Sequence, residues 1–195
     1  MKIGHYVIVL FIAVLFSACK SVNKKLISIE GKAQGTTWHI SYLADEAISY
    51  KSGIESILKD LDSSLSTYLP ASIISRINRN DSTVILDHYF IDVFVKAREV
   101  SQKTEGLFDV TVGPLVNAWG YGFANRDKID SKLIDSLLKY VGYHWVHLTD
   151  HKLIKDKPQI VLDFNAIAQG YSVDVLANYL ESKNITNYLV ELGGE

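Results

Sequence analysis

The stretch that most constrains the fold is residues 104–122, TEGLFDVTVGPLVNAWGYG. Glycine, proline and threonine interrupt its apolar residues at short intervals, so neither the period of a strand nor that of a helix runs through it. The pattern predicts a turn, then the carboxylate of Asp109, then a short apolar helix. Ordering such glycine-containing backbone costs conformational entropy. We therefore expect something to lie against this surface.

The first 18 residues have the pattern of a secretory signal peptide. Lys2 precedes an apolar run over residues 6–16, and two small residues follow the run. As a helix the run is too short to span a hydrocarbon layer of about 30 Å. Cys19 comes directly after Ser-Ala, as in a bacterial lipobox, so we expect it to be lipidated once residues 1–18 are removed. The alternative is a plain signal peptide followed by an incidental cysteine.

This pattern divides the chain into a signal peptide at residues 1–18, a lipidated cysteine with its tether at residues 19–28, and a folded portion at residues 29–195. We expect such a protein to be exported and lipid-anchored to a bacterial membrane, facing the periplasm. The formal net charge is −2, because 22 acidic residues outnumber 20 lysines and arginines. This balance argues against a nucleic-acid partner, which needs clustered positive charge.

Beyond the tether, strand and helix patterns follow one another without an internal repeat. Residues 26–43 alternate in polarity and are rich in β-branched and aromatic side chains, which predicts a hairpin. The interleaving is typical of α/β or α+β proteins, and we expect α+β, a mixed sheet with flanking helices. We predict helices around residues 54–65, 72–77, 90–100, 133–141 (with its leucines buried) and 173–180, and strands at 84–86, 145–148 paired with 159–162, and 188–192.

Residues 163–171, DFNAIAQGY, follow a strand pattern and open a helix. Asn165 is a good N-cap, and a helix N-terminus favours an anionic group such as a phosphate. The alternative is an ordinary capped helix after a strand. For Asp109, the alternative to a ligand contact is the N-cap of the following helix. Tyr68, taken alone, is more often a core residue, although its ring stacks well on a planar ligand.

Two other patterns point away from further sites. His144, His147 and His151 do not have the spacing of a metal-binding pair on a helix, so we expect no histidine metal site. Gly120-Tyr121-Gly122 lacks the third glycine of a dinucleotide fingerprint, and no phosphate-loop pattern occurs.

Four segments together carry a family resemblance. They are GKAQGTTW at residues 31–38, STY and SIISRIN within residues 66–78, the stretch at residues 104–122, and DFNAIAQGYSVD at residues 163–174. In this order they resemble the FAD:protein FMN transferases, the ApbE family, which implies an ApbE-like fold of the T-fold type. Members of that family continue well past the match to Gly-Gly-Glu at the end of this chain. We therefore expect residues 29–195 to be the N-terminal portion of a flavin transferase domain, truncated at the C-terminus.

The resemblance implies a reaction and a site. FMN from FAD would be attached by a phosphodiester bond to a Thr hydroxyl of an acceptor protein, in a Mg²⁺-dependent transfer. The acceptors would be subunits of membrane redox complexes, and no catalytic residue is identified. Many members have Met in place of Gln34 and Lys in place of Gln169, which weakens these two contacts. The implied FAD contacts are Gln34, Tyr68, Leu107, Phe108, Asp109, Asp163 and Gln169, and the implied Mg²⁺ ligand is the backbone carbonyl of Ala166.

Several nearby residues have weaker or alternative roles. Ser72, Ser75 and Asn78 are expected at a helix end or turn and not as ligands, although the resemblance also implies that Asn78 is a weaker flavin candidate. Glu191 and Glu195 flank the final Gly-Gly pair, where they would lie either near the active centre or solvated at a strand end.

Two further functions stay open from the sequence. The protein could be a flavin-binding lipoprotein or an FAD pyrophosphatase that releases FMN and AMP. It could also be an inactive relative, because the family's remaining Mg²⁺ ligands, an Asp and a Thr, come from a segment beyond Gly-Gly-Glu. One backbone carbonyl does not hold an octahedral cation by itself. We therefore expect these 195 residues alone to be weakly active at best.

Overall fold

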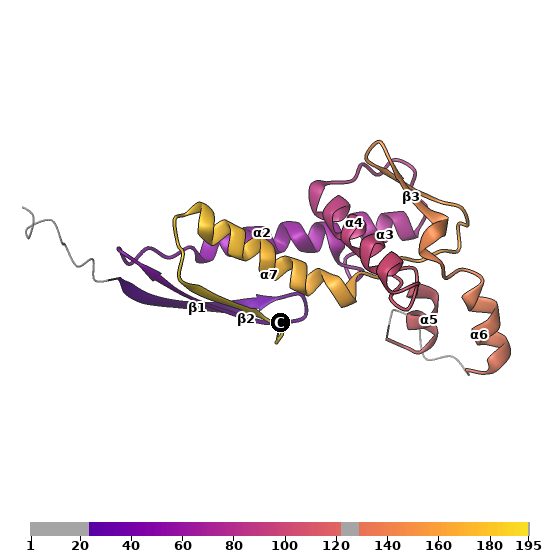
Figure 1. The fold of residues 1–195 in the computed structure, drawn as a ribbon, viewed down its shortest axis with the longest axis horizontal. Coiled ribbons are helices and arrows are strands. Elements are labelled where there is room, and N and C mark those ends of the chain that lie inside the picture. The colour runs from indigo at the N-terminus through magenta and orange to yellow at the C-terminus, as the bar shows by residue number, and fades with distance from the viewer. Residues whose placement is uncertain (1–23, 122–128, 195) are drawn as a thin grey trace, which may run out of the picture.

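The computed structural model describes residues 24–121 and 129–194. The signal peptide, the lipidated Cys19 and Glu195 of the sequence predictions lie outside this part of the chain. The described molecule is elongated (Figure 1). A three-stranded sheet under two long helices forms one end, and the remaining helices with a two-stranded sheet form the other. This is an α+β architecture, as predicted.

The larger sheet begins with the predicted hairpin. Strand β1, Lys25–Ala33, pairs antiparallel with β2, Thr36–Ala44, and β2 pairs antiparallel with β5, Tyr188–Leu192. The spatial order is β1-β2-β5. Gln34 and Gly35 form the two-residue turn between β1 and β2, and both have positive φ, 51° and 74°. Two-residue hairpin turns of this kind match the twist of the flanking strands, and the hairpin itself was predicted from the alternating pattern.

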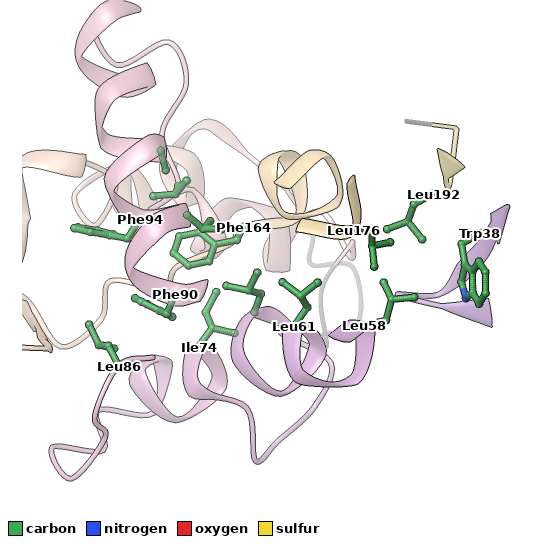
Figure 2. Packing of buried hydrophobic residues seen from close by; sticks show 14 of the residues in the cluster. Trp38, Leu58, Leu61, Ile74, Leu86, Phe90, Phe94, Phe164, Leu176 and Leu192 are labelled. Carbon is green, nitrogen blue, oxygen red and sulfur yellow. The ribbon is translucent and has the colours of Figure 1, made fainter. Parts of the chain in front are cut away.

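Two long helices, α2 at Lys51–Leu65 and α7 at Asn165–Ser182, cover one face of this sheet (Figure 1). Both were predicted from apolar residues at helical spacing. Each contributes leucines to a core that also takes alternate residues of β2, because successive strand side chains point to opposite faces. The fully buried side chains of this part include Trp38, Ile40, Tyr42, Ile54, Leu58, Leu61, Leu176, Leu180 and Leu192 (Figure 2).

The same core continues into the second half of the molecule. Helices α3, Ile73–Asn78, and α4, His88–Lys103, were both predicted and pack beside α2. The rings of Phe90 and Phe164 lie 5.1 Å apart between α4 and the start of α7 (Figure 2). One contiguous apolar cluster therefore anchors the segment that leads into α7.

The turn and short helix predicted within residues 104–122 are both present. Helix α5 spans Gly113–Ala118. Helix α6, Ser131–Leu138, also forms where predicted, but the prediction that its leucines are buried is wrong. None of its residues is buried, and Leu138 is 47% exposed. The helix packs against α5 at the end of the molecule away from the large sheet (Figure 1), and among the described residues α5 is the main element that it contacts.

Two strand predictions are also wrong. Residues 84–86 form no strand, and only Leu86 of these donates a backbone hydrogen bond, to the His151 carbonyl at 2.9 Å. Residues 159–162 do not pair with residues 145–148. A 3₁₀ turn, Tyr143–Trp145, leads instead into β3, Val146–Thr149, which pairs with β4, Lys152–Lys155. Alternation over three or four residues is too short to fix a strand partner.

No helix within residues 24–121 and 129–194 combines the length and the apolar character needed to cross a membrane.

Candidate functional site

Three hollows meet around the N-terminus of α7. They share lining residues: Tyr68 and Asn165 border all three, and Asp163 borders two of them. We name each hollow after one residue that lines it and does not line the other two. They are the Gln34 hollow of about 600 Å³, the Phe108 hollow of about 570 Å³ and the Asn117 hollow of about 360 Å³.

The Gln34 hollow lies between the β1–β2 turn, the end of α2 and the first turns of α7. Its apolar wall is formed by Leu61, Leu65 and Leu69, and its polar groups include two glutamines and one carboxylate. The described residues that line it are Gln34, Gly35, Leu61, Asp62, Leu65, Ser66, Tyr68, Leu69, Asn165, Ala168 and Gln169, none of them basic.

The Phe108 hollow lies against the turn of the 104–122 stretch. The backbone of Gly106 to Asp109 forms one side and valines from residues 110, 112, 116 and 141 line the interior. Glu105 and Gly106 have positive φ, 52° and 83°. This pair of left-handed residues turns the chain so that Leu107, which is 94% exposed, stands at the rim. A rim of turn backbone over an apolar floor suits a flat ring with polar edges.

The Asn117 hollow completes the group. It is lined by Thr67, Tyr68, Pro70, Ser75, Asn78, Arg79, Gly113, Asn117, Tyr121, Val161, Leu162, Asp163 and Asn165. Arg79 is its only basic lining residue among those described, and its guanidinium donates to the Pro70 carbonyl at 2.6 Å. The hollow therefore presents amides, hydroxyls and two tyrosine rings.

The structure brings the sequence candidates together. Gln34, Tyr68 and the 107–109 turn line the three hollows, although they come from separate parts of the chain. Asp163, Ala166 and Gln169, at the start of α7, line these hollows or the adjacent groove between α4 and α7. Tyr68 is 58% exposed, so the alternative that places it in the core is wrong. The ligand contacts themselves stay predictions.

The carboxylate of Asp109 is tied to neighbouring backbone. Its Oδ1 accepts hydrogen bonds from the Thr111 N–H at 2.8 Å and the Thr111 hydroxyl at 2.7 Å. Its Oδ2 accepts from the Tyr143 N–H at 2.7 Å. It does not cap α5, whose N-cap is Val112. Asp109 thus fixes the turn that borders the Phe108 hollow, and any contact with a ligand would be in addition to these bonds.

Asp163 shapes the entry into α7. Its backbone N–H donates to the Val110 carbonyl at 2.8 Å, and its Oδ1 accepts from the Asn165 N–H at 2.8 Å. The prediction that Asn165 is the N-cap is wrong, because the N-cap is Phe164 and makes no side-chain cap. The Phe164 ring is buried in the core, so Asp163 rather than the capping residue satisfies a backbone donor at this helix end.

Ser72, Ser75 and Asn78, at the ends and in the first turn of α3, make the structural hydrogen bonds that were expected of them. Ser72 is the N-cap and accepts from the Ser75 N–H, and the Ser75 hydroxyl donates to the carbonyls of Ser66 and Thr67. Asn78 binds Leu162 with both atoms of its amide. These bonds hold Tyr68 and the 161–163 segment on either side of the Asn117 hollow.

The two glutamines lie at the junction of β2, β5 and α7. Gln34 donates from Nε2 to the Ser172 hydroxyl at 2.8 Å. Gln169 lies against Gly193, where an added Cβ would meet its Nε2 at 3.0 Å and the Thr36 methyl at 2.9 Å. Gly193 has φ 64°, and a side chain added at this turn after β5 would press on the Gln169 side chain.

Glu191 interacts on the outer face of the sheet. Its Oε2 lies 2.6 Å from His39 Nδ1, and its Oε1 accepts from the Gly194 N–H. The hydrogen bond with His39, followed by that from Gly194, lowers the pKa of the Glu191 carboxyl. It lines none of the three hollows, which agrees with a strand-end role, and Glu195 lies outside the described residues.

The sequence analysis missed Asp62. This residue lies in the last turn of α2, is half-buried and lines the Gln34 hollow. Burial raises the pKa of its carboxyl. The available signal was an acidic residue between two predicted core leucines at the C-terminal end of a helix, where negative charge is unfavourable.

Metal ligands are sparse in the described part of the chain. Residues 24–121 and 129–194 contain no group of three or more His, Cys, Asp or Glu side chains placed to hold a metal ion. His147 instead lies 3.2 Å from the Asp156 carboxylate. Ala166, the residue implied as a Mg²⁺ ligand, is the second residue of α7 and is exposed. The described residues do not by themselves fit a magnesium site.

Comparison with known proteins identifies the family. The ApbE family model matches residues 34–195. The FAD:protein FMN transferase of Haemophilus influenzae is 37% identical in an alignment that covers 100% of this chain and 60% of the relative. The protein of the same name from Vibrio cholerae is 31% identical, with coverages of 98% and 59%. The chain belongs to the ApbE family, as the sequence motifs predicted.

Solved structures agree with this assignment. Flavin transferase ApbE from Vibrio cholerae has a TM-score of 0.82 and 32% identity to this chain, covering 88% of this chain and 58% of that one. The apo form of flavinyl transferase ApbE from Pseudomonas stutzeri has a TM-score of 0.81 and 27% identity, with coverages of 88% and 57%. The chain thus spans about 60% of the length of the relatives it matches.

Proposed function

We propose that this member of the ApbE family takes part in FAD:protein FMN transfer, and that the three hollows around the start of α7 bind FAD. The hydroxyl oxygen of an acceptor Thr would attack the phosphorus of the FMN half of FAD. The bond from that phosphorus to the bridging oxygen would break, AMP would leave, and the hydroxyl proton would be released. FMN would then be joined to the acceptor by a phosphodiester bond.

The observation that carries this proposal is the convergence of four chain segments on three adjoining hollows. The β1–β2 turn, the end of α2 with Tyr68, the 106–109 turn, and the stretch from Asp163 into the first turns of α7 each border at least one of these hollows. These segments include each described residue that the family resemblance names. Two hollows of similar size on either side of a helix N-terminus suit a dinucleotide, because its two ring systems flank a pyrophosphate.

The described residues suit the parts of FAD in different ways. The N-terminus of α7 favours the pyrophosphate. Tyr68 is exposed and lines all three hollows, and a tyrosine ring stacks well on a planar group. The apolar floor of the Phe108 hollow suits a second ring. Catalysis of phosphoryl transfer depends mainly on positioning and on stabilising charge on the phosphate oxygens, so these contacts would serve to hold the pyrophosphate in line with the acceptor hydroxyl.

Magnesium dependence is part of the proposal, with Ala166 as the residue taken from the resemblance. Mg²⁺ would neutralise charge on the phosphate oxygens. Because the described residues offer no group of acidic side chains for it, most ligands would have to come from elsewhere. The acceptor, a protein of a membrane redox complex, and the lipid anchor at Cys19 on a periplasm-facing membrane surface are likewise proposed.

A transfer assay tests the proposal. The protein is mixed with FAD, Mg²⁺ and an acceptor domain that carries a flavinylation Thr, and the acceptor is examined for covalent flavin fluorescence on a denaturing gel. We expect a fluorescent acceptor band that disappears when a chelator is added or when the acceptor Thr is replaced by Ala. FMN and AMP released without a labelled acceptor would favour FAD pyrophosphatase activity, and FAD binding without turnover would favour a flavin-binding protein.

A further inference from the structure

The Asp62 carboxylate lies in the Gln34 hollow, and no described residue offsets the cost of burying its charge there. Among residues 24–121 and 129–194, no side chain or backbone group forms a hydrogen bond or ion pair with it, although Gln34, Tyr68 and Gln169 line the same hollow. The residue is half-buried, and burial raises the pKa of its carboxyl. A desolvated carboxylate without a donor is unfavourable.

The position of Asp62 on α2 adds a second unfavourable term. The residue lies in the last turn of Lys51–Leu65, a turn with no basic residue, where the helix dipole disfavours negative charge. Its neighbours along the chain, Leu61 and Ser63, are a fully buried core residue and an exposed one. An acidic residue at this position departs from the preference of helix C-termini for basic or neutral side chains. Such departures from local rules are expected at functional sites.

The other groups of the Gln34 hollow limit what Asp62 would bind. A phosphate is disfavoured, because the described lining residues include no base and the carboxylate repels an anion. A metal ion is disfavoured, because no second carboxylate lines the hollow. The leucine wall and the ring of Tyr68 instead suit a flat ring, and a carboxylate accepts hydrogen bonds only from donors.

We propose that Asp62 accepts a hydrogen bond from an N–H donor on one of the two ring systems of the bound dinucleotide, and so fixes the orientation of that ring system in the Gln34 hollow. This inference rests on the proposed binding of FAD. FAD carries two such donors, the imide N–H of the flavin and the amino group of adenine. Either would turn the unfavourable charge of Asp62 into a charge-assisted hydrogen bond. Asp62 would then be a residue that determines specificity.

Separate titrations with FMN and with ADP test this inference and distinguish the two donors. Binding to the protein is measured by calorimetry for the wild type, Asp62→Ala, Asp62→Asn and the control Asp60→Ala. Asp60 lies two residues earlier on α2, is exposed and lines none of the three hollows. Thermal unfolding of each variant without ligand shows whether the fold is kept.

We expect Asp62→Ala to lower the affinity for one of the two ligands by roughly 10- to 100-fold, which is the range for a hydrogen bond to a charged group. The affinity for the other ligand should fall by less than about twofold. The ligand whose affinity falls identifies which ring, flavin or adenine, donates to Asp62. Asp62→Asn keeps an acceptor oxygen without the charge, so its loss of affinity should be smaller than that of Asp62→Ala. Asp60→Ala should bind both ligands as the wild type does.

Unchanged binding of both ligands by Asp62→Ala would overturn this inference and leave the proposed function standing. An equal loss for both, or a marked fall in the unfolding temperature, would also overturn it, because either would indicate a structural role. A wild-type protein that bound neither ligand would overturn the proposed FAD site together with this inference.

Discussion

The side chain of Asn78 and the backbone of Leu162 exchange two hydrogen bonds across 84 residues of sequence. Asn78 Nδ2 donates to the Leu162 carbonyl at 2.9 Å, and the Leu162 N–H donates to Asn78 Oδ1 at 2.8 Å. The amide takes the place of a neighbouring strand for one residue. This exchange attaches the end of α3 to the segment that enters α7, and it sets the position of Asp163 next to the Asn117 hollow.

Replacing Asn78 should therefore affect both stability and binding. Asn78→Ala leaves the N–H and carbonyl of the buried Leu162 without partners, and we expect it to lower the free energy of unfolding by about 2–4 kcal/mol. Urea unfolding measures this loss. The control Asn178→Ala, at an exposed position of α7, should change it by less than about 0.5 kcal/mol. A loss at Asn78 no larger than at Asn178 would contradict the role given to the exchange.

Asp109 should behave as a structural carboxylate as well as a candidate ligand contact. Asp109→Ala removes the acceptor of three hydrogen bonds, from the backbone and hydroxyl of Thr111 and from the backbone of Tyr143. We expect a loss of about 2–4 kcal/mol in the free energy of unfolding. Asp135→Ala, at an exposed position of α6, is the control. If Asp109→Ala unfolded at the wild-type urea concentration, its bonds would not be fixing the turn.

The fate of Asp109 shows what the sequence could and could not predict. Its place after a turn and before a short helix was readable from the Gly and Pro positions around it. Its partner Tyr143 was not, because that contact joins segments more than 30 residues apart and no periodicity records it. The long helices were predictable because each carries several apolar residues at one spacing. The strands predicted at 84–86 and 159–162 rested on too few residues for such a pattern, and the structure has no strand at either place.

The site was predicted in part for a similar reason. Motif resemblance named Tyr68 and the 107–109 turn, and the structure places them on adjoining hollows. Asp62 belongs to no motif that the sequence analysis used, and its significance depends on burial and on the absence of a described partner, which are three-dimensional properties. The N-cap at Phe164 was missed because core packing of its ring outweighed the capping preference of Asn165.

The turn after β5 should control the position of Gln169. Gly193→Ala adds a Cβ at 3.0 Å from Gln169 Nε2, at a residue with φ 64°. We expect the affinity for FAD to fall by roughly 3- to 10-fold, equivalent to about 1 kcal/mol. Gly194→Ala is the matched control, because its φ is 95° and an added Cβ meets nothing within 4 Å. Equal losses for the two variants would assign the effect to backbone strain instead of Gln169.

The raised pKa of Asp62 predicts a pH-dependent effect on stability. A carboxyl whose pKa is higher in the folded protein than its usual 3.8 favours folding while it is protonated, and this contribution is lost as the pH rises through the folded pKa. Without ligand, Asp62→Asn should therefore gain stability over the wild type at about pH 7 and gain less at about pH 3. Urea unfolding at both pH values measures the difference. A gain in stability that did not depend on pH would show that the ionised carboxylate of Asp62 carries no desolvation cost. The control Asp60→Asn should show no pH-dependent gain in stability.

Binding of FAD to the surface around Tyr68 can be measured by titrating the protein with FAD. Flavin fluorescence is followed for the wild type, for Tyr68→Ala and for Leu189→Ala, a control with a similarly exposed side chain on β5. We predict saturable binding by the wild type and by Leu189→Ala, and affinity weakened by about tenfold in Tyr68→Ala through loss of ring stacking. No saturable binding, or equal affinity in all three proteins, would contradict the account.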